Sequence, residues 1–459
     1  MEKLNTSWKE ILKVALPIST GVFVQFIVVF IDNYFVAQLN GPAMSAASFV
    51  GLIYVTLVMV GVGLGNAVQI LVARRKGEEK MDEAGQVVGN ALWIALVVAA
   101  AQFLLLYFVL PGILNATIHS ETVLGYMKQF IEYRAFGFFF YTLTLVLNSF
   151  WAGIARTKVM IFTTIITATV TIILDYGLVF GHLGLPNMGM SGAALATCIA
   201  EASAFIFVLI YTLKNHDHFI ERKTDPDGRE LHQSYNLKKW FLALPTMHSK
   251  SLARLGGPIS LQMLASLGIW VIFYEFVESM GERELQSSFI VRTMYTLVYV
   301  SVGGFSTTTK TYISGLIAEH RQSELHSLMK KMMLMNFVGV LLLSHGLWLY
   351  PEWIASQFST DPVVIDFTVR TMHIVLPAML TFSITSILLG TVEGSGNTVA
   401  GFLVEFITVT VYIVAAYYMV YIWKWPVHLV WTADYIYFIL LGLLSLFFLW
   451  NGKWKYKKI

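Results

Sequence analysis

The sequence predicts an all-α integral membrane protein with twelve transmembrane helices, arranged as two parallel six-helix repeats. Its composition, its long apolar runs and an internal duplication together predict this fold class. Of the 459 residues, 56% are hydrophobic and 13% are charged, and the mean hydropathy is +0.67. Soluble proteins carry about 25% charged residues. The net charge of +3 is too small to indicate a nucleic-acid partner, so we expect the chain's surroundings to be lipid.

The chain opens with a lysine-bearing segment and then enters an apolar run at residues 14–37. This run is too long for the core of a signal peptide, so we expect a retained helix. Eleven further runs are long enough to span a bilayer, near residues 46–73, 88–110, 135–155, 159–181, 190–213, 255–277, 286–318, 332–350, 372–392, 399–422 and 429–450. The sequence therefore predicts twelve spans.

Lysine and arginine are unevenly distributed between the loops. They collect at the N-terminus and near residues 74–80, 156–158, 214–254, 321–331 and 453–458. The alternate loop 38–45 has none, and 351–366 is acidic. By the positive-inside rule, both termini are predicted to be cytoplasmic, in a multi-pass protein of the cell inner membrane.

One long polar connection, residues 214–254, predicts a linker between an N-terminal lobe, 1–213, and a C-terminal lobe, 255–459. Its four histidines, His216, His218, His232 and His248, are expected to be solvated loop residues. The single cysteine, Cys198, excludes an intramolecular disulfide and is expected to pack as a small side chain.

The two halves of the chain repeat one another at an offset of 240 to 241 residues. The matched words are Leu16-Pro17-Ile18-Ser19 with Gly257-Pro258-Ile259-Ser260, Ser48-Phe49-Val50 with Ser288-Phe289-Ile290, His119-Ser120-Glu121 with Ser359-Thr360-Asp361, and Gly153-Ile154-Ala155 with Gly394-Ser395-Gly396. Because each copy has an even number of spans, both point the same way, related by a pseudo-twofold axis along the membrane normal. This parallel-repeat arrangement is typical of alternating-access transporters.

Two acids lie inside apolar runs, Asp32 in the first span and Asp175 in the fifth. A carboxylate there costs roughly 2.5–3.5 kcal/mol, so it is expected to be functional. Each lies about five residues, or roughly 8 Å, before the outer end of its span, so the two are expected to meet. Their counterparts 241 residues on are Phe273 and Ala416. Gln25 and Asn148 likewise correspond to Ser266 and Leu389. We therefore expect this column of four polar residues, and the coupling chemistry, in the first repeat alone.

Two carboxylates in a low dielectric need a proton or a cation between them. Gln25 precedes Asp32 by seven residues and Thr171 precedes Asp175 by four, so each shares a helix face with an acid. Thr197 reaches a similar depth on the sixth span. Carboxylate and hydroxyl oxygens suit hard cations. These five residues are the predicted coupling site, with Asp32 and Asp175 as the ligands if the ion is Na⁺.

Four stretches of the sequence resemble the multidrug and toxic compound extrusion (MATE) family. They are the Asp of span one, Gly61–Gly77 at the end of span two, Gly153-Ile154-Ala155-Arg156-Thr157 after span four, and Leu185–Thr197 entering span six. The resemblance covers nearly the whole chain. It implies a secondary active antiporter, without enzymatic activity or cofactor, that exports organic, often cationic, drug-like compounds by alternating access in exchange for Na⁺ or H⁺. It also implies that span one bends, for which Pro17 and Gly21 are the candidate hinge.

The sequence departs from the family pattern in the second repeat. Many relatives carry a Glu in span seven and an acid in span ten, where this chain has Ser266 and Phe382. Glu275 and Glu405 are the acids to test there, with a snorkelling or loop-facing role as the alternative. Lys310 is either an inner-gate cation or a snorkelling anchor. In several relatives an Asn stands at the position of Thr171, which leaves Na⁺ and H⁺ both open.

Aromatic and methionine side chains suit a cavity for apolar cations, and its candidate lining residues are Tyr141, Asn148, Tyr274 and Glu275. We expect a monomer that binds small drug-like molecules and membrane lipid. The alternative function is a flippase for lipid-linked oligosaccharides, which shares the fold but needs a more basic cavity. Arg134 and Lys310 are the only support for it. A membrane-embedded enzyme would need paired His and Asp at one depth, whereas the histidines lie mostly in loops and at span ends.

Overall fold

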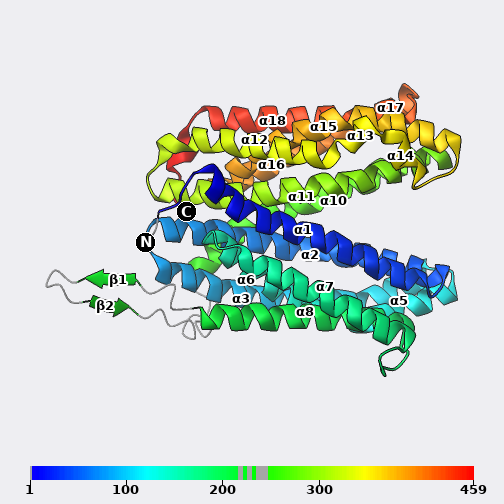
Figure 1. Ribbon diagram of the computed structural model, residues 1–459, viewed down its shortest axis with the longest axis horizontal. Helices are drawn as coiled ribbons and strands as arrows, with labels where there is room; N and C mark the ends of the chain where they lie inside the picture. The colour runs from blue at the N-terminus through cyan, green and yellow to red at the C-terminus, as the bar shows by residue number, and fades with distance from the viewer. Residues whose placement is uncertain (1–2, 216–220, 225–229, 234–246) are drawn as a thin grey trace. The chain divides into compact units, whose positions relative to one another are not determined.

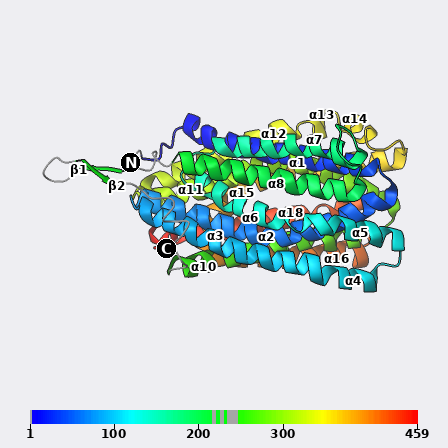
Figure 2. The ribbon, with the colours of Figure 1, turned by 90° about the horizontal axis from the view of Figure 1, so that it is seen from below.

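The computed structural model describes residues 3–215, 221–224, 230–233 and 247–459, and is helical except for one hairpin (Figure 1). The first repeat contains α1 (Trp8–Ala37), α2 (Gly41–Gly77), α3 (Met81–Leu104), a π-helical turn (Leu105–Val109), α4 (Leu110–Thr117), α5 (Glu121–Arg134), α6 (Gly137–Gly153), α7 (Lys158–Phe180) and α8 (Gly189–Lys214). Strands β1 (Glu221–Thr224) and β2 (Glu230–Gln233) form an antiparallel pair within the predicted linker (Figure 2). The rest of the linker between residues 216 and 246 lies outside the described residues.

The second repeat follows the same order of long helices. It contains α10 (Met247–Glu278), α11 (Glu282–Ala318), a 3₁₀ turn (Gln322–Glu324), α12 (Leu325–Ser344), α13 (Gly346–Leu349), α14 (Pro351–Ser356), α15 (Pro362–Gly394), α16 (Thr398–Tyr417), a π-helical turn (Tyr418–Ile422), α17 (Val427–Val430), α18 (Ala433–Trp450) and a 3₁₀ turn (Lys453–Tyr456).

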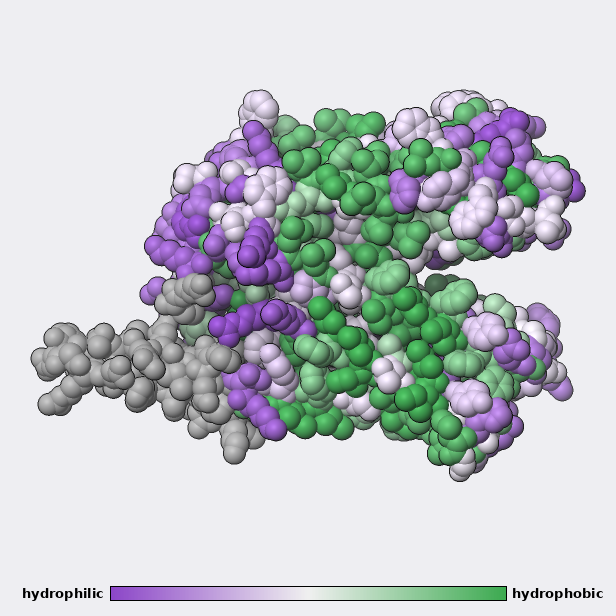
Figure 3. All heavy atoms as spheres, in the orientation of Figure 1, coloured by the Kyte–Doolittle hydropathy of each residue, from purple (hydrophilic) through white to green (hydrophobic). Residues whose placement is uncertain are grey.

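Eleven helical segments of the described chain are long and apolar enough to cross a membrane. A twelfth is formed by α5 and α6 together, which are bent by 48° at the break between them. The predicted count of twelve is therefore confirmed. Figure 3 shows that apolar side chains cover the middle of the helices on the face in view, whereas polar side chains gather near their ends. This distribution is the one expected of helices that span a bilayer.

The chain forms two compact units, and the boundaries between them do not coincide with the linker. One unit contains Phe23–Ser260, and the other contains Leu4–Val22 together with Leu261–Ile459. The first helix of each repeat is therefore shared. The N-terminal part of α1 belongs to the unit of the second repeat, and the N-terminal part of α10 belongs to the unit of the first.

In each unit, a glycine allows the N-terminal part of one of these shared helices to pack closely against its neighbour. A Cβ on Gly63 of α2 would lie 2.6 Å from the Ser260 backbone nitrogen and 2.8 Å from the Gly256 carbonyl oxygen of α10. In the other unit, a Cβ on Gly304 of α11 would lie 2.9 Å from the Ala15 carbonyl oxygen and would collide with Ser19 of α1. Gly63 and Gly304, like Ser19 and Ser260, are 241 residues apart. The repeated Pro-Ile-Ser word thus marks a packing contact that occurs once in each unit.

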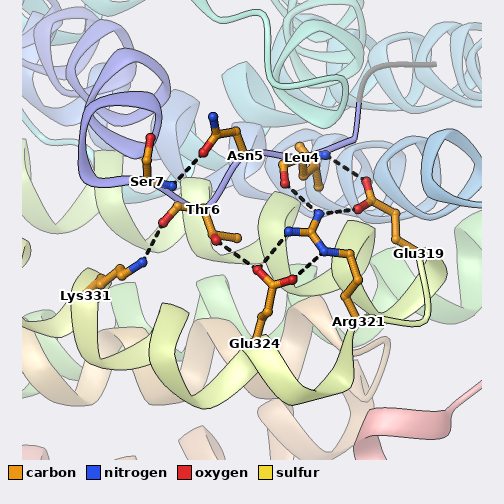
Figure 4. A network of polar contacts seen from close by, with 8 residues as sticks. All are labelled: Leu4, Asn5, Thr6, Ser7, Glu319, Arg321, Glu324 and Lys331. Atoms are coloured by element: carbon orange, nitrogen blue, oxygen red, sulfur yellow. Dashed lines mark hydrogen bonds and ion pairs between the residues drawn. The ribbon is translucent and has the colours of Figure 1, made fainter.

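The segment before α1 is held on the second-repeat unit by polar contacts, shown in Figure 4. The backbone N–H of Leu4 donates to Glu319 at 3.0 Å, and the Leu4 carbonyl accepts from Arg321 at 2.6 Å. The Thr6 hydroxyl donates to Glu324 at 2.9 Å. Hydrogen bonds to Glu324, and then to Glu319, raise the pKa of Arg321 above its usual value. A guanidinium held between two carboxylates thus fixes the start of the chain beside α11 and α12.

Candidate functional site

The structure brings the two intramembrane acids together. α1 ends at Ala37 and α7 ends at Phe180, in each case five residues after the acid. Close to these ends, the rings of Phe35 and Phe180 meet edge to face, with centroids 5.9 Å apart. The carboxyl groups of Asp32 and Asp175 lie close enough to interact directly. The predicted meeting of the two acids at one depth is therefore observed.

This acid pair lacks hydrogen-bond donors. Asp175 is fully buried, and within the described residues no donor reaches either of its carboxyl oxygens, Oδ1 of Asp32 or the hydroxyl oxygen of Thr171. Buried polar atoms are normally hydrogen-bonded, so these oxygens are available to a proton, a water molecule or a cation. Two carboxyl groups can share a hydrogen bond only when one of them carries a proton. A shared proton or a bound cation would offset the repulsion between the two carboxyl groups.

The other predicted members of the coupling site differ in their placement. Thr171 is fully buried one turn before Asp175, on the same face of α7. Thr197 is half-buried, and its hydroxyl donates to the Ala193 carbonyl of its own helix at 3.0 Å. Gln25 is exposed on α1. Of these three residues, Thr171 is the one whose hydroxyl oxygen has no hydrogen-bond partner and lies on the same helix face as one of the acids. Among the described residues, no group of three or more His, Cys, Asp or Glu side chains is placed to hold a metal ion, so bound Na⁺ would also need hydroxyl or carbonyl oxygens.

The four predicted cavity residues are divided between the units. In the first-repeat unit, Asn148 is half-buried and Tyr141 interacts with the buried charges of Glu201 and Arg134. In the second, Tyr274 is buried, its ring is stacked on Phe289 at 4.7 Å, and its hydroxyl donates to the Ser288 carbonyl at 3.4 Å. The adjacent Glu275 is exposed. Tyr274 and Glu275 therefore point into different surroundings, and their place in a substrate cavity stays a prediction.

Comparison with known proteins assigns this chain to a family. The profile of the family MatE matches residues 17–177 and 258–418, which together make up more than half of the chain. The chain belongs to the MATE family of transporters. The matched stretches begin at Pro17 and Pro258, so the family unit coincides with the internal repeat. The resemblance inferred from the sequence is confirmed, and so is the twelve-helix fold of two repeats.

Curated relatives and solved structures agree with this assignment. A probable multidrug resistance protein NorM from Thermotoga maritima is 22% identical over 461 residues, covering 98% of this chain and 94% of the relative. Another from Synechocystis is 24% identical over 355 residues, covering 76% and 73%. A mutant of the Vibrio cholerae MATE transporter VcmN superposes with a TM-score of 0.86 at 16% identity, over 98% of each chain. An outward-facing multidrug resistance MATE transporter of the MOP superfamily gives 0.85 at 16% identity, over 100% of each chain.

This MATE protein has a buried ion pair that the sequence reasoning missed. Arg134, the last residue of α5, forms a two-pronged pair with Glu201 of α8, with both N–O distances at 2.9 Å. Glu201 is an acid inside a predicted span, so the argument applied to Asp32 would have found it. Arg134 was harder to recognise because the predicted fourth span began only at residue 135.

The second-repeat unit of this MATE protein carries buried acids of its own, at positions other than those that correspond to Asp32 and Asp175, and the expectation that the coupling chemistry lies in the first repeat stays a prediction. Glu405 of α16 accepts a hydrogen bond from Ser266 at 2.6 Å and another from Tyr437. Asp434 of α18 accepts from Tyr295 and Tyr412. The shift by 241 residues could not reveal these acids because their counterparts in the first repeat, Thr164 and Ala193, are not acids. Ser266, where many relatives have a Glu, thus contacts a carboxylate supplied by another helix.

Lys310 is not a snorkelling side chain in this MATE protein. Its ammonium lies 2.7 Å from a carboxylate oxygen of Glu393, and both side chains are buried. The amide of Gln262 donates to the same carboxylate at 2.9 Å. The lysine therefore neutralises a buried acid between α11 and α15.

Proposed function

We propose that this protein is a secondary active antiporter that exports organic, often cationic, drug-like compounds in exchange for Na⁺ or H⁺. Its membership of the MATE family supports transport, and the names of the NorM relatives support multidrug substrates. The proposed cycle is alternating access. The protein exposes its substrate site to one side of the membrane and then to the other, as in other transporters built from parallel repeats.

The observation that carries the coupling proposal is the contact between Asp32 and Asp175, where the acids lack hydrogen-bond donors within the described chain. An ion on the pair neutralises charge that the low dielectric disfavours. Loss of the ion leaves two repelling carboxylates. Ion binding and release therefore change the relative free energies of conformations that differ in the separation of the two helices. A transporter couples two fluxes through this kind of differential stabilisation.

Helix α1 is the element through which the pair would act. Pro17 lies inside α1 and cannot donate a backbone hydrogen bond, which makes its turn easier to bend. The boundary between the compact units falls at Val22–Phe23, next to Gly21. We place the hinge of α1 at Pro17 and Gly21, with the part of α1 after it carrying Asp32.

Orientation and location follow from the basic loops. We place both termini in the cytoplasm and the acid pair toward the outer face of the cell inner membrane. We propose that the protein works as a monomer, with lobes 1–213 and 255–459 joined by linker 214–254. The flippase alternative loses its support, because Arg134 and Lys310 each pair with a buried carboxylate, Glu201 and Glu393.

The test is substrate efflux from proteoliposomes that contain the purified protein. Ethidium is loaded, and its exit is followed under an imposed Na⁺ gradient, under an imposed pH gradient and with no gradient. We expect one of the two ion gradients to accelerate efflux, while liposomes without protein stay slow. Equal efflux under all three conditions would rule out ion-coupled export.

A further inference from the structure

Helix α10 has the same weak point as α1. Pro258 lies inside α10 as Pro17 lies inside α1, at equivalent positions of the two repeats. A proline cannot donate a backbone hydrogen bond, so each helix lacks one bond of its ladder and bends more easily there. α10 also passes from the first-repeat unit to the second-repeat unit just after this proline, between Ser260 and Leu261. The backbone alone would therefore let both helices bend.

One turn after Pro258, a side chain of α10 is bonded to α15. The amide nitrogen of Gln262 donates to Oε1 of Glu393 at 2.9 Å, and the ammonium of Lys310 on α11 lies 2.7 Å from Oε2 of the same carboxylate. Gln262 and Glu393 are each 2% exposed, and Lys310 is 5% exposed. A hydrogen bond to a charged group is strong, and more so where water is excluded. This bond therefore holds the turn of α10 that follows the proline.

The carboxylate that holds Gln262 lies among closely packed helices. A Cβ on Gly394 of α15 would lie 2.8 Å from Cα and 2.9 Å from the carbonyl oxygen of Lys310, so the backbones of α11 and α15 are in contact beside it. Gly401 of α16 packs against the acid itself, because a Cβ there would lie 3.1 Å from Cγ of Glu393. The acceptor of the bond therefore has little freedom to follow α10 if that helix moves.

A second polar side chain of α10 is bonded one turn further on. Ser266 follows Gln262 by four residues and so lies on the same face of the helix. Its hydroxyl donates to Glu405 of α16 at 2.6 Å, and Glu405 also accepts a hydrogen bond from Tyr437 of α18. Two consecutive turns of α10 are thus tied to buried carboxylates on two different helices.

The first repeat supplies an internal comparison. Gln262 and Ser266 correspond to Gly21 and Gln25 of α1. Gly21 has no side chain with which to bond a neighbour, and Gln25 is exposed. The two helices therefore share the proline and differ in what holds the two turns after it.

We propose that Gln262 and Ser266 form a clamp that keeps α10 in one conformation beyond Pro258. The clamp offsets the weakness that the proline introduces, because opening α10 there would break two hydrogen bonds to buried carboxylates. α1 has no equivalent clamp, so bending at a proline is confined to the helix that carries Asp32. The inference rests on the proposed function for its meaning in transport, but local opening of α10 can be measured without transport.

The experiment is hydrogen–deuterium exchange of the purified protein in detergent, followed in a peptide that covers residues 261–272. The double variant Gln262→Ala/Ser266→Ala removes both clamp side chains, while each carboxylate keeps its other partner. We expect this peptide to exchange at least about tenfold faster in the variant, the factor that a hydrogen bond to a charged group contributes to local stability. Alanine is the better helix former at both positions, so helix propensity alone would slow exchange instead.

The matched control is Val271→Ala, in the same peptide. Val271 is 55% exposed, so its truncation breaks no clamp bond and should leave the exchange rate unchanged or lower. The single variant Ser266→Ala keeps the Gln262 bond and should give an intermediate rate. It serves the same comparison if the double variant does not fold.

Unchanged exchange of the 261–272 peptide in the clamp variants would overturn the proposal. Equal acceleration in a peptide of α18 would also overturn it, because the variants would then have destabilised the whole unit instead of releasing α10. If the 261–272 peptide alone accelerates but the wild type shows no ion-dependent ethidium efflux, the proposed antiport function fails and the clamp stands. If efflux is ion-dependent and exchange does not change, the clamp fails and the antiport function stands.

Discussion

At the residue scale, the buried acids of the described chain fall into two kinds. Glu201, Glu393, Glu405 and Asp434 each have an arginine, a lysine or hydroxyl donors around the carboxylate. Asp175 is as buried as these but has neither. A satisfied carboxylate stabilises one conformation, whereas an unsatisfied one gains most from an ion that comes and goes. Among the buried acids of the described residues, Asp175 is thus distinguished by its lack of donors rather than by its burial, which supports the proposed coupling role.

Replacing either member of the pair should uncouple transport. Asp32→Asn and Asp175→Asn keep the size of the side chain but remove the charge that binds the ion, so we expect ethidium efflux driven by the ion gradient to fall to the rate without a gradient. Asp82→Asn, at an exposed acid in the first turn of α3, is the matched control and should transport normally. Gradient-driven efflux at the wild-type rate by both pair variants, reconstituted in equal amount, would remove the pair from the coupling site.

The sequence was sufficient to find Asp32 and Asp175 because a carboxylate in a long apolar run is expensive and therefore conspicuous. It could not show that the Thr197 hydroxyl bonds its own helix at Ala193 or that Gln25 is exposed, and the place of both in the coupling site stays a prediction. Helical periodicity gives the face of a residue but not what covers that face. Glu405 and Asp434 could not be paired with their tyrosines because those contacts join residues 32 and 139 positions apart.

At the element scale, the shared first helices are the main departure from the predicted organisation. The sequence divides the chain at its polar linker, whereas the contacts place the N-terminal parts of α1 and α10 in the opposite units. The repeat predicts that Ser19 and Ser260 are equivalent. It gives no information on which helix each one touches, because chain order does not determine which helices pack together.

The glycines at these contacts should be sensitive to an added methyl group. Gly63→Ala and Gly304→Ala place a Cβ against the backbone of α10 and α1, and overpacking of this kind costs about 1–3 kcal/mol. We expect both to lower the thermal unfolding midpoint in detergent. At Gly268 of α10 a Cβ meets nothing within 4 Å, so Gly268→Ala should preserve or raise the midpoint, since Ala favours a helix by about 1 kcal/mol. Equal midpoints for all three variants would contradict the packing argument.

The segment before α1 should loosen when its central cation is removed. Arg321→Ala removes the donor to the Leu4 carbonyl and leaves Glu319 and Glu324 as repelling neighbours. We expect faster hydrogen–deuterium exchange in a peptide covering residues 4–11. The control is Arg370→Ala, which breaks an exposed pair with Asp366 elsewhere in the second repeat. Unchanged exchange in Arg321→Ala would show that the polar network does not hold the segment.

The helix prediction was weakest at the fourth span. The predicted span, 135–155, covers α6 but omits α5, which contains Glu121, Lys128, Glu132 and Arg134. Charged residues lower the hydropathy of the helix without preventing it from forming, because their side chains find exposure or a partner. The hydropathy of the sequence therefore gave no sign of the 48° bend, at which Arg134 is hydrogen-bonded.

At the scale of the whole molecule, composition and the repeat were sufficient to predict a twelve-helix membrane protein with two equivalent halves. Both the family match over two stretches and the solved transporters of the same fold agree with this prediction. The fold was predictable because few architectures can span a lipid bilayer and because the second half of the chain repeats the pattern of the first. The two halves are not identical, since the positions that correspond to Asp32, Asp175 and Arg134 are Phe273, Ala416 and Val375.

Binding of the coupling ion at the Asp32–Asp175 pair can be tested by measuring ion movement that a substrate gradient drives. Proteoliposomes are given an ethidium gradient but no ion gradient, and uptake of protons and of radioactive Na⁺ is followed in the direction opposite to ethidium. We expect uptake of one of these ions by the wild type and none above background by Asp32→Asn. Ethidium movement without any ion uptake in the wild type, or equal uptake in Asp32→Asn, would show that the pair does not bind a coupling ion.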